Sequence, residues 1–413
     1  MTRKKIEIIS PVGSYESLMA AIAGGADAVY FGIGTLNMRA RSSMNFSFDD
    51  LVKITDICRE SNIRSYLTLN TVIYDEEMEY MQKMIDVAVG NGISAVIASD
   101  IAVMEYALSR GMEIHISTQC NISNFEAVRF YSRYADAMVL ARELSLDQIK
   151  NIIQKIKQEN ITGPSGKIVD IELFIHGAMC MAVSGKCYLS QDMFNKSANR
   201  GACYQPCRRE YRIRDYDDEV DLIIDNHFIL SPKDMKTIDF LDQLVSAGVS
   251  ILKIEGRGRA PEYVKTVTNC YREAVDAIEE GTFEPEKLKI WNERLAQVYN
   301  RGYWEGYYLG KTLPEWTDAY GSKATQRKAY VGKVTNYFSK AGVAEITMES
   351  GALSVGDKFL ILGPTTGVAE GVVSEIRVHE LPVNKSVKGE ICSIPVNETV
   401  RRSDKLYIIT ERK

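Results

Sequence analysis

The feature that most constrains the fold of this chain is a regular alternation of short β-rich runs with longer helical patterns. Eight such runs occupy residues 6–9, 28–33, 65–69, 95–98, 113–117, 137–140, 170–175 and 250–254. Amphipathic patterns, such as those at 77–89 and 146–156, lie between most of them. This rhythm predicts parallel strands joined by crossover helices. Eight units in about 280 residues predict a (β/α)8, or TIM-type, barrel.

An open doubly wound sheet is the alternative to a closed barrel. Gly32 and Gly34 follow the second run, but the third glycine and the following helical pattern of a dinucleotide-binding turn are missing. The closed barrel is therefore the expected α/β fold.

The pattern changes in the C-terminal part of the chain. From residue 329 onward, short alternating runs are separated by glycine-containing turns, which predicts a small antiparallel β-barrel over 329–413. Residues 313–328 include Pro314, Gly321 and several polar side chains, and we expect them to form a linker. The TIM-type barrel domain is expected to span residues 1–312.

Half of the eight cysteines lie in one stretch after the seventh run. Cys180, Cys187, Cys203 and Cys207 fall within 28 residues. The stretch, about residues 177–220, is too long for an ordinary βα loop. We expect it to be an insertion over the mouth of the barrel.

Four thiolates brought together suit either an iron–sulfur cluster or a zinc ion. Only Cys203 and Cys207 form the close pair that is usual in structural zinc sites. Six residues separate Cys180 from Cys187, and this spacing favours a cluster. Zinc and unligated buried thiols are the alternatives that the spacing leaves open.

Polar residues follow the ends of most predicted strands, and these ends form the active face of a (β/α)8 barrel. Several converging arginines suit an anionic substrate such as a small dicarboxylate. A ring of salt bridges, for example Arg142 with Glu143, is the alternative for any single residue. The predicted substrate-binding residues are Arg39, Arg41, Asn70, Gln119, Arg142, Glu143, Lys253 and Arg257.

Two residues are candidates for catalysis. His176 follows the seventh run, and an unperturbed histidine titrates near neutral pH, so it is the predicted proton carrier. Its alternative role is to orient a cluster ligand. Glu255, after the eighth run, is the second candidate. The other histidines have no evident catalytic context.

The net charge of −5 gives no general support for nucleic-acid binding, so RNA contact would need a local patch. Arginines interleaved with tyrosines after the cysteines form the best candidate, and a solvated charged face is the alternative. These residues are Tyr204, Arg208, Arg209, Tyr211, Arg212 and Arg214.

Targeting and membrane signals are missing from the sequence. The N-terminal residues contain no apolar core with a cleavage site, and no run of 18 uncharged apolar residues occurs. We expect a soluble, cytoplasmic protein without membrane contact.

Several motifs, in this order, resemble the collagenase-like peptidase family U32. The resemblance runs from about residue 7 to about residue 311, with a matching C-terminal module. The motifs are NMRA at 37–40, LARELS at 140–145, ELFIHGAMC at 172–180, SGKCYLS at 184–190, LSPKD at 230–234, KIEGR at 253–257 and NRG at 300–302.

Better-understood members of this family resemble iron–sulfur proteins that assist oxygen-independent hydroxylation. The resemblance implies prephenate-dependent 5-hydroxylation of the tRNA wobble uridine, with a 4Fe–4S cluster and with prephenate, a dicarboxylate, as co-substrate. It implies tRNA and a paralogous subunit as partners. A U32-type peptidase, or an accessory cluster-carrying subunit of an RNA or quinone-precursor hydroxylase, are the alternatives. The peptidase signatures H-E-x-x-H and G-x-S-x-G are missing.

Overall fold

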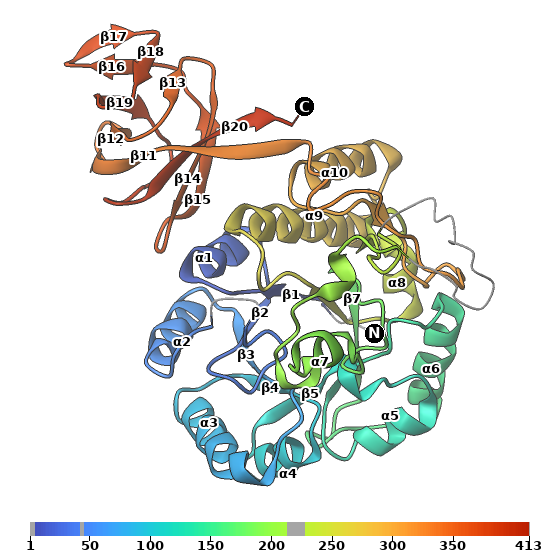
Figure 1. Cartoon of the computed structure of the whole chain (residues 1–413). Helices are drawn as coiled ribbons and strands as arrows, with labels where there is room; N and C mark the ends of the chain where they lie inside the picture. Colours follow the sequence, from blue (N-terminus) through green and yellow to red (C-terminus); the bar gives the residue numbers. More distant parts are fainter. Residues whose placement is uncertain (1–4, 42–44, 213–227, 413) are drawn as a thin grey trace.

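The computed structural model describes residues 5–41, 45–212 and 228–412. A ring of helices surrounds a central barrel of strands, and a domain made of strands lies beside α1 and α9 (Figure 1). None of the helices that the structure describes is long and apolar enough to cross a membrane.

Eight parallel strands close into a ring, which confirms the predicted TIM-type barrel. Each of the first seven strands pairs with the next, and β9 pairs with both β7 and β1. This closure rules out the open doubly wound sheet. The strands are β1 (Glu7–Pro11), β2 (Ala28–Phe31), β3 (Arg64–Leu69), β4 (Ala95–Ala98), β5 (Glu113–Ile116), β6 (Ala137–Val139), β7 (Asp170–Ala178) and β9 (Ile251–Ile254).

Amphipathic helices cover the outside of the barrel. In α6 (Leu146–Gln158) the apolar residues Ile149, Ile152 and Ile156 recur at helical spacing and are buried. Ser145 caps this helix by accepting the Gln148 N–H at 3.4 Å. The other helices are α1 (Tyr15–Ala23), α2 (Asp50–Glu60), α3 (Met78–Gly90), α4 (Ile101–Ser109), α5 (Phe125–Tyr131), α8 (Leu241–Ala247), α9 (Pro261–Glu280) and α10 (Pro285–Gln297).

Strand β7 extends three residues beyond its predicted end. There it pairs antiparallel with β8 (Asp234–Lys236), which in turn pairs with β10 (Tyr303–Trp304). Gly177 has a φ of +107°, and a Cβ atom at this position would lie 2.6 Å from the Glu255 carbonyl oxygen. Glycine therefore allows the end of β7 to approach the end of β9 closely.

The cysteine-rich segment leaves the end of β7 and crosses the C-terminal ends of the barrel strands. It contains α7 (Leu189–Phe194) and the single turns η3 (Ala198–Arg200) and η4 (Pro206–Arg208). Arg200 anchors it through a two-pronged ion pair with Glu77 and stacks 4.0 Å from the Tyr74 ring. The predicted end of this segment, with Arg214, and also His227 lie outside the described residues.

The C-terminal domain is antiparallel, as predicted. One sheet has the order β15-β14-β20-β11-β12-β19-β16-β17, and β13 pairs with β18. The strand order is linear, so the structure has an antiparallel sheet where the sequence predicted a small antiparallel barrel. The strands are β11 (Gln326–Phe338), β12 (Val343–Met348), β13 (Ala352–Ser354), β14 (Lys358–Gly363), β15 (Gly367–Val372), β16 (Ile376–Val378), β17 (Leu381–Val383), β18 (Lys385–Val387), β19 (Ile391–Pro395) and β20 (Lys405–Glu411).

Strand β15 packs on helices α1 and α9, and β14 packs on α1. Leu360, Leu362 and Val368 are buried in the same apolar cluster as the barrel core. Lys265 of α9 donates to the Val368 carbonyl oxygen at 3.2 Å and pairs with Glu370 at 3.0 Å. The two domains therefore share a core in addition to the chain connection.

Candidate functional site

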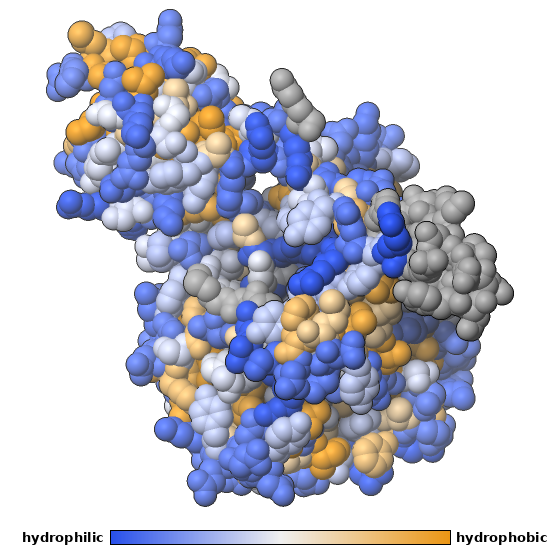
Figure 2. Space-filling view, in the orientation of Figure 1, coloured by the Kyte–Doolittle hydropathy of each residue, from blue (hydrophilic) through white to orange (hydrophobic). Residues whose placement is uncertain are grey.

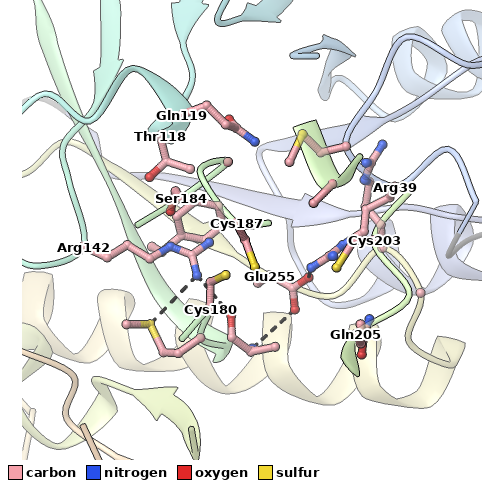
Figure 3. Close-up of a pocket in the computed structure, with 18 of the residues that line it drawn as sticks. Arg39, Thr118, Gln119, Arg142, Cys180, Ser184, Cys187, Cys203, Gln205 and Glu255 are labelled. Atoms are coloured by element: carbon pink, nitrogen blue, oxygen red, sulfur yellow. Dashed lines mark hydrogen bonds and ion pairs between the residues drawn. The ribbon is translucent and has the colours of Figure 1, made fainter. Parts of the chain in front are cut away.

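A cavity of about 250 Å³ lies where the barrel strands end, beneath the cysteine-rich segment (Figure 3). Its walls combine residues that follow β2, β3, β5, β6 and β9 with residues of the segment itself. The site thus occupies the face of the barrel at which the sequence predicted it.

All four predicted metal ligands line this cavity. Cys180, Cys187 and Cys203 are drawn in Figure 3 with their sulfur atoms toward the cavity, and Cys207 completes the set. All eight cysteines of the chain are free thiols. The cysteines outside the segment do not line the cavity, and three of them, Cys58, Cys270 and Cys392, are buried.

The protonation and positions of the four thiols affect which metal or cluster they could bind. Burial and the neighbouring cysteines together raise the pKa of Cys207 to about 11, although Arg208 opposes the shift. Binding a metal would remove these protons. In the described ranges, no three histidine, cysteine or acidic side chains converge on a single-ion site. Four free thiols around one cavity are a donor set that an iron–sulfur cluster could use.

The cavity wall is strongly cationic. Of the lining residues that the structure describes, seven are cationic and one is a carboxylate, Glu255. This balance favours an anionic occupant beside the thiols. The cationic residues are Arg39, Arg142, Arg208, Lys253, Arg257, Arg259 and Arg301.

Glu255 is held by two donors. Arg39 Nη2 contacts its Oε1 at 3.0 Å, and the Ala178 N–H donates to its Oε2 at 3.3 Å. Although burial opposes ionisation, Arg39 and Arg259 lower the pKa of Glu255 to about 2. At neutral pH the residue is a carboxylate that joins the ends of β7 and β9, and it accepts hydrogen bonds.

Arg257 is 5% exposed and is bound by neutral groups. Its guanidinium donates to Thr68 Oγ1 at 2.8 Å and to Asn37 Oδ1 at 3.0 Å. Burial lowers its pKa to about 10, so it stays cationic at neutral pH. A Cβ atom at Gly32 would lie 2.6 Å from Arg257 Nη1, which explains the glycine. Because both recorded partners are uncharged, the positive charge of Arg257 is available to an anion.

Two polar atoms of the cavity wall lack partners within the described structure. Arg142 lies 3.9 Å above the Phe174 ring and donates to the Ala178 carbonyl oxygen at 3.0 Å, but its Nε is buried and unbonded. Thr118 Oγ1 is also buried and unbonded. Unsatisfied buried polar groups are rare, and here they mark positions where a ligand would bond. Nearby, Asn70 Nδ2 donates to Gln119 Oε1 at 3.3 Å.

Three predicted site residues do not line the cavity. Arg41 is exposed and donates to the Tyr204 hydroxyl at 3.3 Å, and Glu143 is exposed. His176 is buried, with its Nδ1 3.3 Å from the Tyr271 hydroxyl of α9. Burial, with Lys236, lowers its pKa to about 3. A register shift between Phe174 and His176 accompanies this placement, and the geometry gives no support to a role as proton carrier at the cavity.

Several residues in or next to the cavity wall were not predicted from the sequence. Lys253 pairs with Glu172 at 2.6 Å. A charged residue inside a strand-like run is the signal that could have indicated Glu172. Arg208, predicted to face RNA, instead turns inward. It donates to the Met179 carbonyl oxygen at 2.6 Å and to Ser231 Oγ at 2.9 Å. The lining residues Tyr30 and Arg301 were also missed.

Aromatic and basic side chains are exposed on the cysteine-rich segment. Tyr188 is 79% exposed and Tyr204 is 47% exposed. Arg209 stacks 5.0 Å from the Phe194 ring, and the Phe194 and Tyr204 rings lie 5.4 Å apart. On the face shown in Figure 2, hydrophilic residues predominate and hydrophobic ones are scattered between them.

Comparisons with known proteins place these features in a family. The family model described as peptidase family U32 matches residues 13–318. A collagenase of Porphyromonas gingivalis strain W83 is 57% identical over 413 residues, which cover 100% of both chains. The tRNA hydroxylation protein P1 of Bacillus subtilis strain 168 is 30% identical over 373 residues, covering 87% of this chain and 84% of that protein.

A third relative matches two thirds of the chain. The 23S rRNA 5-hydroxycytidine synthase of Escherichia coli K12 is 37% identical over 275 residues, which are 66% of this chain and 40% of the synthase. Since the family model covers most of the barrel domain and the full-length match is high, the chain belongs to peptidase family U32.

Proposed function

We propose that this protein is an iron–sulfur protein that takes part in oxygen-independent 5-hydroxylation of the tRNA wobble uridine, with prephenate as co-substrate. The observation that carries the proposal is the arrangement of four free thiols around a cavity with seven cationic lining residues and one acidic one. A peptidase that uses water as its nucleophile has no need for this combination.

The four cysteines would hold a 4Fe–4S cluster, which supplies one-electron redox chemistry when bound. Their positions in the segment are fixed by Arg200, which bonds Glu77, and by Arg208, which bonds the end of β7. The chain's own contribution is to orient the thiols and to surround them with positive charge, which balances an anionic cluster and an anionic substrate.

Prephenate carries two carboxylates, and the cavity offers matching donors. Arg257 has a charge that its neutral partners leave uncompensated, and Arg142 has a free Nε. Lys253 and Thr118 lie in the same wall. Guanidinium groups bind carboxylates with two parallel hydrogen bonds, so these residues would position the dicarboxylate next to the thiols.

The exposed rings and arginines of the cysteine-rich segment would receive the RNA. Bases stack on aromatic side chains, and arginines neutralise phosphates. Tyr188, Tyr204 and Arg209 present both kinds of contact at the rim of the cavity. The names of the relatives from Bacillus subtilis and Escherichia coli, a tRNA hydroxylation protein and an rRNA hydroxycytidine synthase, support an RNA substrate. A cytoplasmic location and a paralogous subunit belong to the same proposal.

Nucleoside mass spectrometry of tRNA tests this function. A strain lacking the gene and any paralogue is expected to lose 5-hydroxyuridine derivatives, and the wild-type gene is expected to restore them. Cys180→Ala is expected not to restore them, whereas Cys392→Ala, in the C-terminal domain, is expected to do so. Unchanged 5-hydroxyuridine derivatives in the deletion strain would reject the proposal.

A peptidase is the second candidate, because the 57%-identical relative is named a collagenase. The two buried histidines offer no nucleophile pair: His115 bonds two glutamates and His176 bonds a tyrosine. We therefore expect no cleavage of fluorescently labelled gelatin by the anaerobically purified protein. Cleavage that disappears in Cys180→Ala but persists in Cys392→Ala would favour the peptidase instead.

A further inference from the structure

Six charged side chains form a hydrogen-bonded chain through the interior of the barrel, beneath the cavity. They come from β1, β3, β5 and β7, which alternate around the ring, and from β9, which lies between β7 and β1. We call this set the buried charge chain; its members, in order, are Glu7, Arg64, Glu113, His115, Glu172 and Lys253.

The upper half of the buried charge chain reaches the cavity. Lys253 Nζ, in the cavity wall, donates to Glu172 Oε1 at 2.6 Å. Glu172 Oε2 lies 2.9 Å from His115 Nδ1. The side chains of His115 and Glu172 are 0% exposed and that of Lys253 is 4% exposed. His115 Nδ1 therefore connects to the cavity through one carboxyl group and one amine.

The lower half reaches the opposite face of the barrel. His115 Nε2 lies 3.3 Å from Glu113 Oε1, and the Glu113 side chain is 34% exposed. Arg64 bonds Glu113 at 2.6 Å and Glu7 at 3.5 Å. The two ring nitrogens of His115 thus face different sides of the molecule.

The buried charge chain is a poor way to stabilise the fold, because burying charged groups costs free energy. Buried ion pairs are often no more stabilising than apolar side chains of similar size. The same barrel interior contains an apolar cluster with Ile9, Ala95 and Ile251, so apolar packing is available there. A buried chain of titratable groups that ends in the wall of a reactive cavity indicates a role in proton transfer.

The charges along the chain alternate in sign. Although burial opposes it, hydrogen bonds to Glu113 and Glu172 raise the pKa of His115 to about 9. The Lys253 ammonium and His115 lower the pKa of Glu172 to about 2, also against the effect of burial. The Tyr66 ring, 4.6 Å from that of His115, completes its surroundings. At neutral pH His115 is an imidazolium with a proton on each nitrogen.

We propose that His115 stores a proton that Glu172 and Lys253 pass to and from the cavity. Lys253 gives a proton from Nζ to an occupant of the cavity and becomes a neutral amine. The His115 imidazolium gives its Nδ1 proton to Glu172 Oε2, and the resulting carboxylic acid rotates and gives that proton to Lys253 Nζ. His115 is left neutral, with its proton on Nε2; one proton has moved and no electron has.

The reverse sequence refills His115 from the cavity. Lys253 would be the catalytic residue, since it lines the cavity, while His115 and Glu172 act through it. The proposal does not depend on which reaction the cavity performs, and its test needs no substrate, so its failure would leave the proposed hydroxylation untouched.

Hydrogen exchange of the two His115 N–H groups, followed by NMR of histidine-labelled protein, tests the proposal. The chain has four histidines, so the spectrum is simple, and His115→Gln assigns the signals. Lys253→Arg keeps the positive charge, but a guanidinium releases a proton on the order of 100-fold less readily than an amine. We expect Nδ1–H exchange in this variant to slow by a similar factor, while Nε2–H exchange stays unchanged.

Lys233→Arg is a matched control. Lys233 is not part of the buried charge chain, and it pairs with Glu315 at 2.8 Å. This substitution is expected to leave both exchange rates unchanged. Wild-type rates for both protons in Lys253→Arg would overturn the proposal. If Lys253→Arg fails to fold, exchange measured on the wild-type protein still tests the proposal. If His115 passes its proton to the cavity, Nδ1–H exchanges faster than the slowest backbone amides of β5 and β7. If His115 is part of a static ion pair, Nδ1–H exchanges as slowly as those amides do.

Discussion

At the residue scale, Gly201 of the cysteine-rich segment packs against residues 37–41, which follow β2. Its φ is +75°, and a Cβ atom would lie 2.3 Å from the Asn37 carbonyl oxygen. Gly281 has the same φ of +75° with nothing within 4 Å of such an atom. Comparing alanine substitutions at the two glycines therefore distinguishes the effect of steric overlap from that of backbone strain.

We predict that Gly201→Ala lowers the free energy of unfolding by roughly 1–3 kcal/mol more than Gly281→Ala does, because only the first substitution adds a clash with backbone. Chemical denaturation of both variants measures the difference. Equal losses would mean that the segment is not packed against the barrel as described.

The raised pKa of His115 also predicts that the stability of the protein depends on pH. Its pKa rises from 6.5 to about 9 on folding, so its stabilising contribution is complete below pH 6.5 and is lost as the pH rises through about 9. The shift corresponds to roughly 3 kcal/mol. We expect the stability advantage of the wild type over His115→Gln to shrink across this window in denaturation experiments. Parallel curves for the two proteins from pH 6 to pH 10 would contradict the assignment.

At the element scale, the barrel could be predicted because each strand is a short β-rich run between helical patterns. Strands β8 and β10 could not be predicted, because they are short and depend on other strands: β8 pairs with the extended β7, and β10 pairs with β8. The four cysteines were found by their clustering alone. The place of His176 was missed because a register shift in β7 has no signal in the sequence.

The turn η4 illustrates how a single side chain orders the cysteine-rich segment. Arg208, next to Cys207, joins the end of β7 at Met179 to Ser231. Its neighbour Arg209 is exposed, and its guanidinium lies 5.0 Å from the Phe194 ring.

We predict that Arg208→Met weakens iron retention on the order of 10- to 100-fold, as is typical when a residue that orients metal ligands is lost. Arg209→Met is expected to retain iron as the wild type does. Iron per chain after exposure to a chelator measures both. Equal retention in the two variants would show that Arg208 does not position Cys207.

At the scale of the whole molecule, the C-terminal domain completes the barrel core. Val368 of β15 is 6% exposed and belongs to that core, whereas Val372 of the same strand is 56% exposed. Burying an unpaired carboxylate at the first position is costly, but a carboxylate at the second remains in water.

We predict that Val368→Asp destabilises the protein by about 3 kcal/mol, and that limited proteolysis then separates the domains at residues 313–325. Val372→Asp is expected to resist the protease as the wild type does. Equal resistance of the two variants would indicate that the domains are held by the chain connection and surface ion pairs alone.

We propose above that Cys180, Cys187, Cys203 and Cys207 hold an iron–sulfur cluster beside a cationic cavity. Iron and zinc analysis of the anaerobically purified, reconstituted protein tests this assignment. We expect about four iron atoms per chain, their loss in Cys203→Ala and their retention in Cys58→Ala. One zinc atom and no iron in the wild type would contradict it.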